Sequence, residues 1–238
     1  MLRRLLIAAL LCLALPLDAF AQTEGRRASA VVELYTSQGC IPCPRANRLL
    51  GQFSREDDVL ALTFPVGIWD YLGWADTLAR PEFTRRQRAY SDSLRELRRT
   101  PQLIMNGAQQ VPTSSWDDAR ALLDTERARG LGGPAVSMVR QRNGRVDIAI
   151  GAGSAPIAPA EVWFVEYERD TITVLITGGV NRNRSVSHFN LVNRITRIGA
   201  WTGAPTSLQR ARCGPSCAVL VQAPNTGPIL AAAFIERR

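Results

Sequence analysis

The spacing of hydrophobic residues changes about halfway along the chain. In the first half, short apolar runs predict four strands, at Val31–Thr36, Asp58–Val66, Gln102–Met105 and Gln109–Val111. Between them, apolar residues recur at helical spacing, as Ala46, Leu49, Leu50 and Phe53 do. Two further helices are expected, one opened by Pro81 and one capped by Ser115. The first half therefore predicts an α/β unit with the order β-α-β-α-β-β-α.

The second half loses the helical period. Val136–Arg140 and Val146–Ile150 flank Asn143-Gly144, a strong hairpin signal. Further strands are predicted at Glu161–Glu168, Thr171–Thr177, Ser185–Arg197, Ala218–Gln222 and Ile229–Ile235. This pattern favours an all-β, antiparallel, sandwich-like domain. The stretch Leu131-Gly132-Gly133-Pro134 predicts the boundary, so we expect one domain over 28–131 and a second over 134–238.

The first 21 residues are typical of a secretory signal peptide. A basic start at Arg3-Arg4 precedes 13 apolar residues, Leu5–Leu17, and Ala19-Phe20-Ala21 offers a cleavage site. The alternative is a membrane anchor, but spanning a bilayer takes about 20 apolar residues. We therefore expect an exported protein, periplasmic or secreted, with no membrane span after cleavage.

Charge and composition narrow the class of partner. The formal net charge is +8, and all 29 basic residues are arginine. The arginines are spread along the whole chain among 21 acidic residues, whereas nucleic-acid binders usually concentrate basic charge on one face. The sequence thus predicts no nucleic-acid partner and indicates no cofactor, and it leaves the oligomeric state open.

Four cysteines remain once Cys12 leaves with the signal. Cys40 and Cys43 stand between the first predicted strand and the first predicted helix. A helix N-terminus stabilises a thiolate and lowers its pKa, and the thiolate is the nucleophile in disulfide exchange. Cys40 is therefore predicted to be the exposed attacking residue and Cys43 the shielded resolving residue. Glu33, on the preceding strand, could accept the proton of Cys43 if it is buried under the helix, or could be a partly solvated acid.

Two segments resemble glutaredoxins: Glu33–Cys43, which includes the Cys-Ile-Pro-Cys motif, and Thr100–Gly107. With Trp69–Trp74 and Leu191–Trp201, the chain resembles a bacterial family of exported, two-domain thioredoxin-like proteins of unknown function. The resemblance implies a thioredoxin-like first domain. It also implies a cis peptide bond at Thr100-Pro101, with Pro101 facing the cysteine pair and the backbone of Thr100 pairing with substrate.

Two other groups have a functional and a structural interpretation. Trp69 and Tyr71 could line a substrate groove beside Cys40, or could pack the inserted segment onto the sheet. Cys213 and Cys217 are predicted to form a local structural disulfide, with a second redox relay as the alternative.

Three functions fit these residues. The first is a periplasmic thiol–disulfide oxidoreductase or isomerase, whose partners are protein or small-molecule thiols and disulfides. The second is a non-catalytic exported binding module in which Cys40–Cys43 is a structural bridge. The third is a copper or zinc protein, but the two cysteine pairs belong to different predicted domains, which argues against one shared ion.

Overall fold

The computed structural model describes residues 23–111, 115–210 and 212–236. The predicted signal peptide, 1–21, lies outside these residues. No helix in the described ranges is long and apolar enough to cross a membrane.

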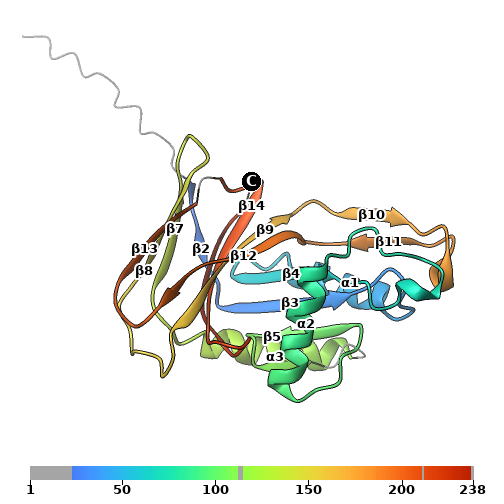
Figure 1. Cartoon of the computed structure of the whole chain (residues 1–238), viewed down its shortest axis with the longest axis horizontal. Helices are drawn as coiled ribbons and strands as arrows, with labels where there is room; N and C mark the ends of the chain where they lie inside the picture. Colours follow the sequence, from blue (N-terminus) through green and yellow to red (C-terminus); the bar gives the residue numbers. More distant parts are fainter. Residues whose placement is uncertain (1–22, 112–114, 211, 237–238) are drawn as a thin grey trace, which may run out of the picture.

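One large sheet runs through the molecule (Figure 1). Its nine strands follow the order β2 (Arg26–Arg27), β15 (Ile229–Ile235), β14 (Ser216–Gln222), β9 (Ala160–Glu168), β12 (Leu191–Trp201), β4 (Val59–Pro65), β3 (Ala30–Thr36), β5 (Gln102–Met105) and β6 (Gln109–Val111). Strands β3 and β4 are parallel, whereas β5 and β6 are antiparallel to their neighbours. The two halves of the chain meet where Leu191 of β12 pairs in parallel with Thr63 of β4.

Two smaller sheets complete the β-structure. A four-stranded sheet has the order β1 (Thr23–Glu24), β7 (Val136–Arg140), β8 (Val146–Ile150) and β13 (Thr206–Arg210), and β10 (Ile172–Leu175) pairs with β11 (Ser185–His188). The predicted hairpin around Asn143-Gly144 is confirmed as β7–β8. Alternating residues of β7 and β8 pack with alternating residues of β9 and β14 in one apolar core, so the four-stranded sheet covers one end of the large sheet.

Three α-helices lie against the large sheet: α1 (Cys43–Phe53), α2 (Pro81–Leu94) and α3 (Trp116–Arg129). The side chains of β3 alternate between two cores. Val32 and Leu34 pack with α1 and α3, while Val31 and Tyr35 pack with α2. Two short 3-10 helices, η1 (Asp70–Leu72) and η2 (Gly179–Asn181), lie in the connections.

The predicted fold class is wrong. Fifteen strands and three α-helices make the described chain mainly β, and it contains no separate α/β thioredoxin-like domain. The local elements of the first half are present, but their strands belong to the same sheet as β9, β12, β14 and β15. Periodicity along a segment reports which of its faces is buried, not which distant strand pairs with its edge. The boundary at Gly132-Gly133-Pro134, where the chain passes from α3 to β7, remains a prediction.

Candidate functional site

Cys40 and Cys43 form a disulfide at the N-terminus of α1, with their Cα atoms 5.4 Å apart. Cys43 opens the helix, and no side chain caps its N-terminus. The first turn of α1 also holds no acidic residue. The positive end of the helix dipole therefore faces the disulfide without a competing carboxylate in that turn.

The prediction that Cys40 is exposed is wrong. Only 4% of its surface is accessible, and Cys43 is fully buried. The neighbouring Ile41 is 63% exposed, so the disulfide lies directly beneath a surface dipeptide, Ile41-Pro42. Cys40 is still the more accessible of the two cysteines.

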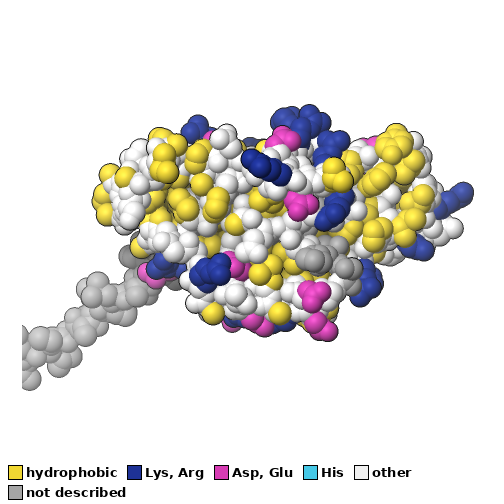
Figure 2. Space-filling model, turned by 90° about the horizontal axis from the view of Figure 1, so that it is seen from below, with side chains coloured by type: hydrophobic (Ala, Val, Ile, Leu, Met, Phe, Trp, Pro, Cys, Tyr) yellow, Lys and Arg dark blue, Asp and Glu magenta, His cyan; other side chains and the backbone are white. Residues whose placement is uncertain are grey.

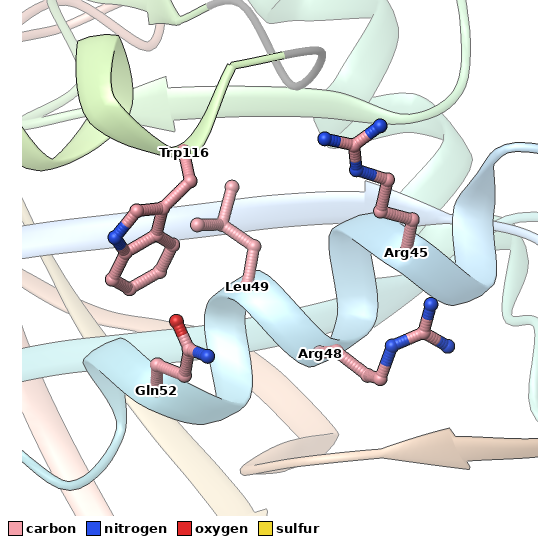
Figure 3. Close-up of a pocket in the computed structure, with 5 residues that line it drawn as sticks. All are labelled: Arg45, Arg48, Leu49, Gln52 and Trp116. Carbon is pink, nitrogen blue, oxygen red and sulfur yellow. The ribbon is translucent and has the colours of Figure 1, made fainter.

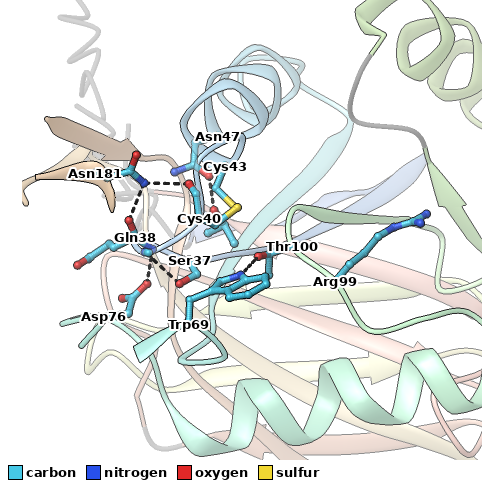
Figure 4. The surroundings of a disulfide bond; sticks show 12 residues. Ser37, Gln38, Cys40, Cys43, Asn47, Trp69, Asp76, Arg99, Thr100 and Asn181 are labelled. Atoms are coloured by element: carbon cyan, nitrogen blue, oxygen red, sulfur yellow. Dashed lines mark hydrogen bonds between the residues drawn. A yellow bond between two sulfur atoms is a disulfide. The ribbon is translucent and has the colours of Figure 1, made fainter. Parts of the chain in front are cut away.

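The loop before Cys40 is held by side chains from two distant segments (Figure 4). The Gln38 amide donates to Oδ2 of Asp76 at 2.7 Å. From η2, Nδ2 of Asn181 donates to the carbonyl oxygens of Gln38 and Cys40, at 2.8 and 2.9 Å. Both Asp76 and Asn181 are buried. These bonds fix the backbone that carries Cys40.

Burial raises the pKa of Asp76 to about 6, against the opposing effect of the backbone N–H groups that donate to it. The folded carboxyl group therefore keeps its proton to higher pH than the unfolded one. Its contribution to stability is present at low pH and is lost as the pH rises from about 4 to about 6.

Asp76→Asn is expected to remove this pH dependence. The difference in unfolding free energy between wild type and variant should change by about 2 to 3 kcal/mol between pH 4 and pH 7, in favour of wild type at the acid end. Urea denaturation of both proteins across this range measures the difference. Parallel stability curves would contradict a raised pKa at Asp76.

A polar cluster lies one helical turn along α1 from Cys43. The Thr36 hydroxyl donates to Oδ1 of Asn47 at 2.7 Å. Asn47 donates in turn to the Ser187 carbonyl oxygen at 2.9 Å and lies 3.5 Å from Nδ1 of His188. Burial lowers the pKa of His188 to about 4, so its ring is neutral at neutral pH. The second half of the chain thus contributes directly to the surroundings of α1.

The predicted substrate-side residues lie beside the cysteine loop. The Thr100–Pro101 peptide bond is cis. Trp69 donates through Nε1 to the Thr100 hydroxyl at 2.7 Å, and a Cβ atom at Gly39 would lie 3.0 Å from the Trp69 Cβ atom. The ring of Tyr71 lies 6.2 Å from that of Trp69, and Tyr71 is 75% exposed. Trp69 and Thr100 therefore form a wall next to the disulfide (Figure 4).

Glu33 does not occupy the position from which it would accept the proton of Cys43. It shares a face of β3 with Val31 and Tyr35, the face that α2 covers, whereas α1 packs on the opposite face. Its carboxylate accepts from Nε of Arg86 at 2.9 Å and from the hydroxyl of Tyr90. Because side chains alternate along a strand, a residue one position along from Glu33 would face α1.

The second disulfide joins Cys213 to Cys217, with a Cα–Cα distance of 5.7 Å. Cys217 lies on β14 and packs in the core between the two larger sheets. Arg140 of β7 donates to the Gly214 carbonyl oxygen at 2.9 Å within the five-residue loop. In the described part of the chain, no group of three or more His, Cys, Asp or Glu side chains could hold a metal ion.

Sequence reasoning missed Asp76, Asn47, His188 and Asn181. Asp76 lies two residues after Trp74, at the end of the aromatic segment Trp69–Trp74, and this closeness in sequence is a signal for it. Asn181 lies 141 residues from Cys40, and His188 lies 141 residues from Asn47, so no local pattern indicates their contact with this site.

The fold and the site define a mainly β protein that carries a disulfide at an uncapped helix N-terminus. The chain belongs to a family described as "Protein of unknown function (DUF1223)", whose model matches residues 31–222. A crystal structure of an Agrobacterium tumefaciens protein is 30% identical, with a TM-score of 0.73, and the match covers 90% of this chain and 96% of that one. No curated protein matches the sequence.

A more distant structure has the same overall fold. HBP35 of Porphyromonas gingivalis is 10% identical, with a TM-score of 0.64, and the match covers 89% of this chain and 76% of that one. At this identity the likeness concerns the fold alone.

Proposed function

We propose that this protein is an exported thiol–disulfide oxidoreductase or isomerase that acts through Cys40 and Cys43. The observation that carries the proposal is the disulfide at the N-terminus of α1, where the first turn has no side-chain cap and no acidic residue. When the disulfide is reduced, the free N–H groups and the helix dipole favour the thiolate form of a cysteine at this position.

In the reductive direction the chemistry has two exchange steps. The Cys40 thiolate attacks one sulfur of a substrate disulfide, which forms a mixed disulfide and releases the other substrate sulfur as a thiolate. The Cys43 thiolate then attacks the Cys40 sulfur, which forms the Cys40–Cys43 disulfide and releases the second substrate thiolate. Two electrons pass to the substrate, and an external thiol restores the reduced pair. The reverse sequence oxidises a substrate dithiol.

The surrounding residues have matching roles in the proposal. Trp69, Tyr71 and the Thr100-Pro101 segment would contact the substrate beside Cys40, because Trp69 is bonded to Thr100 and Tyr71 is largely exposed. Asn181 and Asp76 would hold the loop so that Cys40 stays at the helix terminus. The substrates would be protein or small-molecule thiols and disulfides. The two disulfides are consistent with export, because disulfide bonds persist in oxidising compartments outside the cytosol.

One observation favours a second candidate, a non-catalytic binding module with a structural Cys40–Cys43 bridge. Both cysteines are almost inaccessible in the disulfide form, at 4% and 0% exposure. Reaction at Cys40 therefore requires the Ile41-Pro42 segment or the Trp69 wall to move. The two candidates differ in whether the reduced pair exchanges with substrates.

The second disulfide provides a matched control for the enzyme hypothesis. Reduction of insulin by dithiothreitol should be accelerated by wild type and lost in Cys40→Ser, because the attacking thiol is removed. Replacing Cys213 and Cys217 together by Ser should leave turnover within about twofold and lower stability by about 2 kcal/mol, the chain-entropy value for a five-residue loop. Turbidity assays and thermal melts measure the two effects. Unaccelerated insulin reduction by wild type would favour the binding module.

A further inference from the structure

A cavity of about 480 Å³ lies beside the second disulfide, where several distant segments meet. Its chemically distinctive lining residues are Arg80, Glu166, Arg194, Arg210, Arg212 and Ser216. Arg80 is the N-cap residue of α2, so this 14-residue helix begins at the cavity. The cavity is remote in sequence from Cys40 and does not depend on the proposed redox function.

The charge in this cavity is unbalanced. Four arginines and one acidic residue, Glu166, line it. The carboxylate lies 3.9 Å from Nε of Arg194, which is the one ion pair between these residues in the described structure. Arginine is always charged in proteins, so these side chains leave about three positive charges that no carboxylate lining the cavity neutralises. Such a concentration of one sign attracts an anion.

Two enclosed polar atoms of the lining residues also lack partners. Nε of Arg210 and the hydroxyl of Ser216 have no hydrogen-bond partner among the described residues, and Ser216 is fully buried. Buried polar groups of folded proteins are almost always paired. The Arg210 guanidinium is held over the Phe164 ring, 5.3 Å from its centroid. The remaining N–H groups of the Arg210 guanidinium can donate to an oxyanion in the cavity.

We propose that this cavity binds a small molecule that carries a phosphate group. Arginine guanidiniums bind phosphate oxygens through paired N–H donors. The cavity volume lies in the range of small-molecule sites, about 300–1,000 Å³. It is larger than the volume that a single phosphate group occupies. The ligand therefore has a body beyond the phosphate, either a second phosphate or an organic group.

A second basic hollow on the outside of α1 provides the comparison (Figure 3). It has a volume of about 310 Å³ and is lined by Arg45, Arg48, Leu49, Gln52 and Trp116. Both of its arginines are exposed, and none of its lining residues has a buried polar atom without a partner in the described structure. A substitution in this second hollow tests whether surface charge alone explains any binding of a phosphate compound.

The proposal is tested by isothermal titration calorimetry of the full-length mature protein at constant ionic strength. The probes are inorganic pyrophosphate, glucose 6-phosphate and succinate. Either phosphate compound should bind at least tenfold more tightly than succinate, and the tighter of the two identifies the body of the ligand. Arg210→Gln and Arg212→Gln should each weaken that binding at least tenfold, whereas Arg48→Gln should change it less than twofold.

Arg212 is exposed, so Arg212→Gln keeps the test open even if Arg210→Gln folds poorly. Equal weakening by Arg48→Gln and Arg212→Gln would overturn the proposal in favour of diffuse charge attraction. Absence of binding by both phosphate compounds at millimolar concentration would overturn it as well. Neither result bears on the activity of Cys40, which the insulin assay measures separately.

Discussion

Arg86→Met is expected to lower the free energy of unfolding by about 3–5 kcal/mol, because it leaves a buried carboxylate without its counter-charge. Glu33 is fully buried and Arg86 is 6% exposed. Their side chains form an ion pair at 2.9 Å between β3 and α2. Gln222 of β14 accepts from Arg86 at 2.9 Å, so the pair also joins the two halves of the chain.

A neighbouring phenol completes this buried network. Burial raises the pKa of Tyr90 well above its ordinary value, with Arg86 acting in the opposite direction. The phenol therefore stays protonated and donates to Glu33. When Arg86 is removed, Tyr90 still donates to the Glu33 carboxylate. The neutral phenol cannot replace the positive charge of Arg86.

Urea denaturation at neutral pH measures the effect of Arg86→Met. The matched control is Arg197→Met, which breaks a pair with Glu161 at 3.3 Å on partly exposed strand surface and should cost less than about 1 kcal/mol. The double variant Glu33→Gln with Arg86→Met should be less destabilised than the sum of the two single changes, since no charge stays buried alone. A loss below 1 kcal/mol for Arg86→Met would show that the pair is not essential to the packing of α2.

Cys43→Ser is expected to accumulate mixed disulfides through Cys40, at least tenfold more than Cys40→Ser accumulates through Cys43. The first variant keeps the more accessible sulfur and loses the group that resolves the intermediate. The second keeps only the fully buried Cys43. Helix N-terminal stabilisation should also hold the pKa of the Cys40 thiol below that of a free cysteine, about 8.5.

The measurement is a non-reducing gel of each variant after periplasmic expression, with mass spectrometry of the adducts. Alkylation of Cys43→Ser as a function of pH gives the pKa of the Cys40 thiol. Cys213→Ser is the control, because its free Cys217 is buried in the core and should form few adducts. If Cys43→Ser forms no adducts and Cys40 titrates near about 8.5, the binding module is the better description.

Several apolar side chains are exposed on the surface around the disulfide. Exposed apolar side chains lie on three segments near the cysteine loop: Ile41, Tyr71 and Leu72 of η1, and Val180 of η2. A Cβ atom at Gly179 would lie 3.3 Å from the Leu72 carbonyl oxygen, so η1 and η2 are in contact. Figure 2 shows hydrophobic side chains at both ends of the molecule, and its right-hand end is the one that carries β10 and β11 in Figure 1.

The sequence by itself determined the local elements. A short apolar run located β3, the Asn143-Gly144 turn located the β7–β8 hairpin, and helical spacing located α1. It also put Cys40 and Cys43 at the start of that helix, because a strand, a short loop and an amphipathic helix are encoded within about 25 neighbouring residues. The hydrogen bonds of a helix and of a hairpin join residues close in sequence, so a local pattern is sufficient to predict α1 and β7–β8. The apolar run of β3 shows only that the strand is buried.

The tertiary structure alone decided what surrounds those elements. The pairing of Leu191 with Thr63 joins strands from the two halves of the chain in one sheet. Asn181 donates to the carbonyl oxygen of Cys40 across a similar distance in sequence. The tertiary structure also decided which face of β3 is covered by α1. Glu33 lies on the other face, so it is excluded from the cysteine site. These contacts depend on how all the buried faces pack at once, and a periodic pattern records only that a face is buried, not which distant surface covers it.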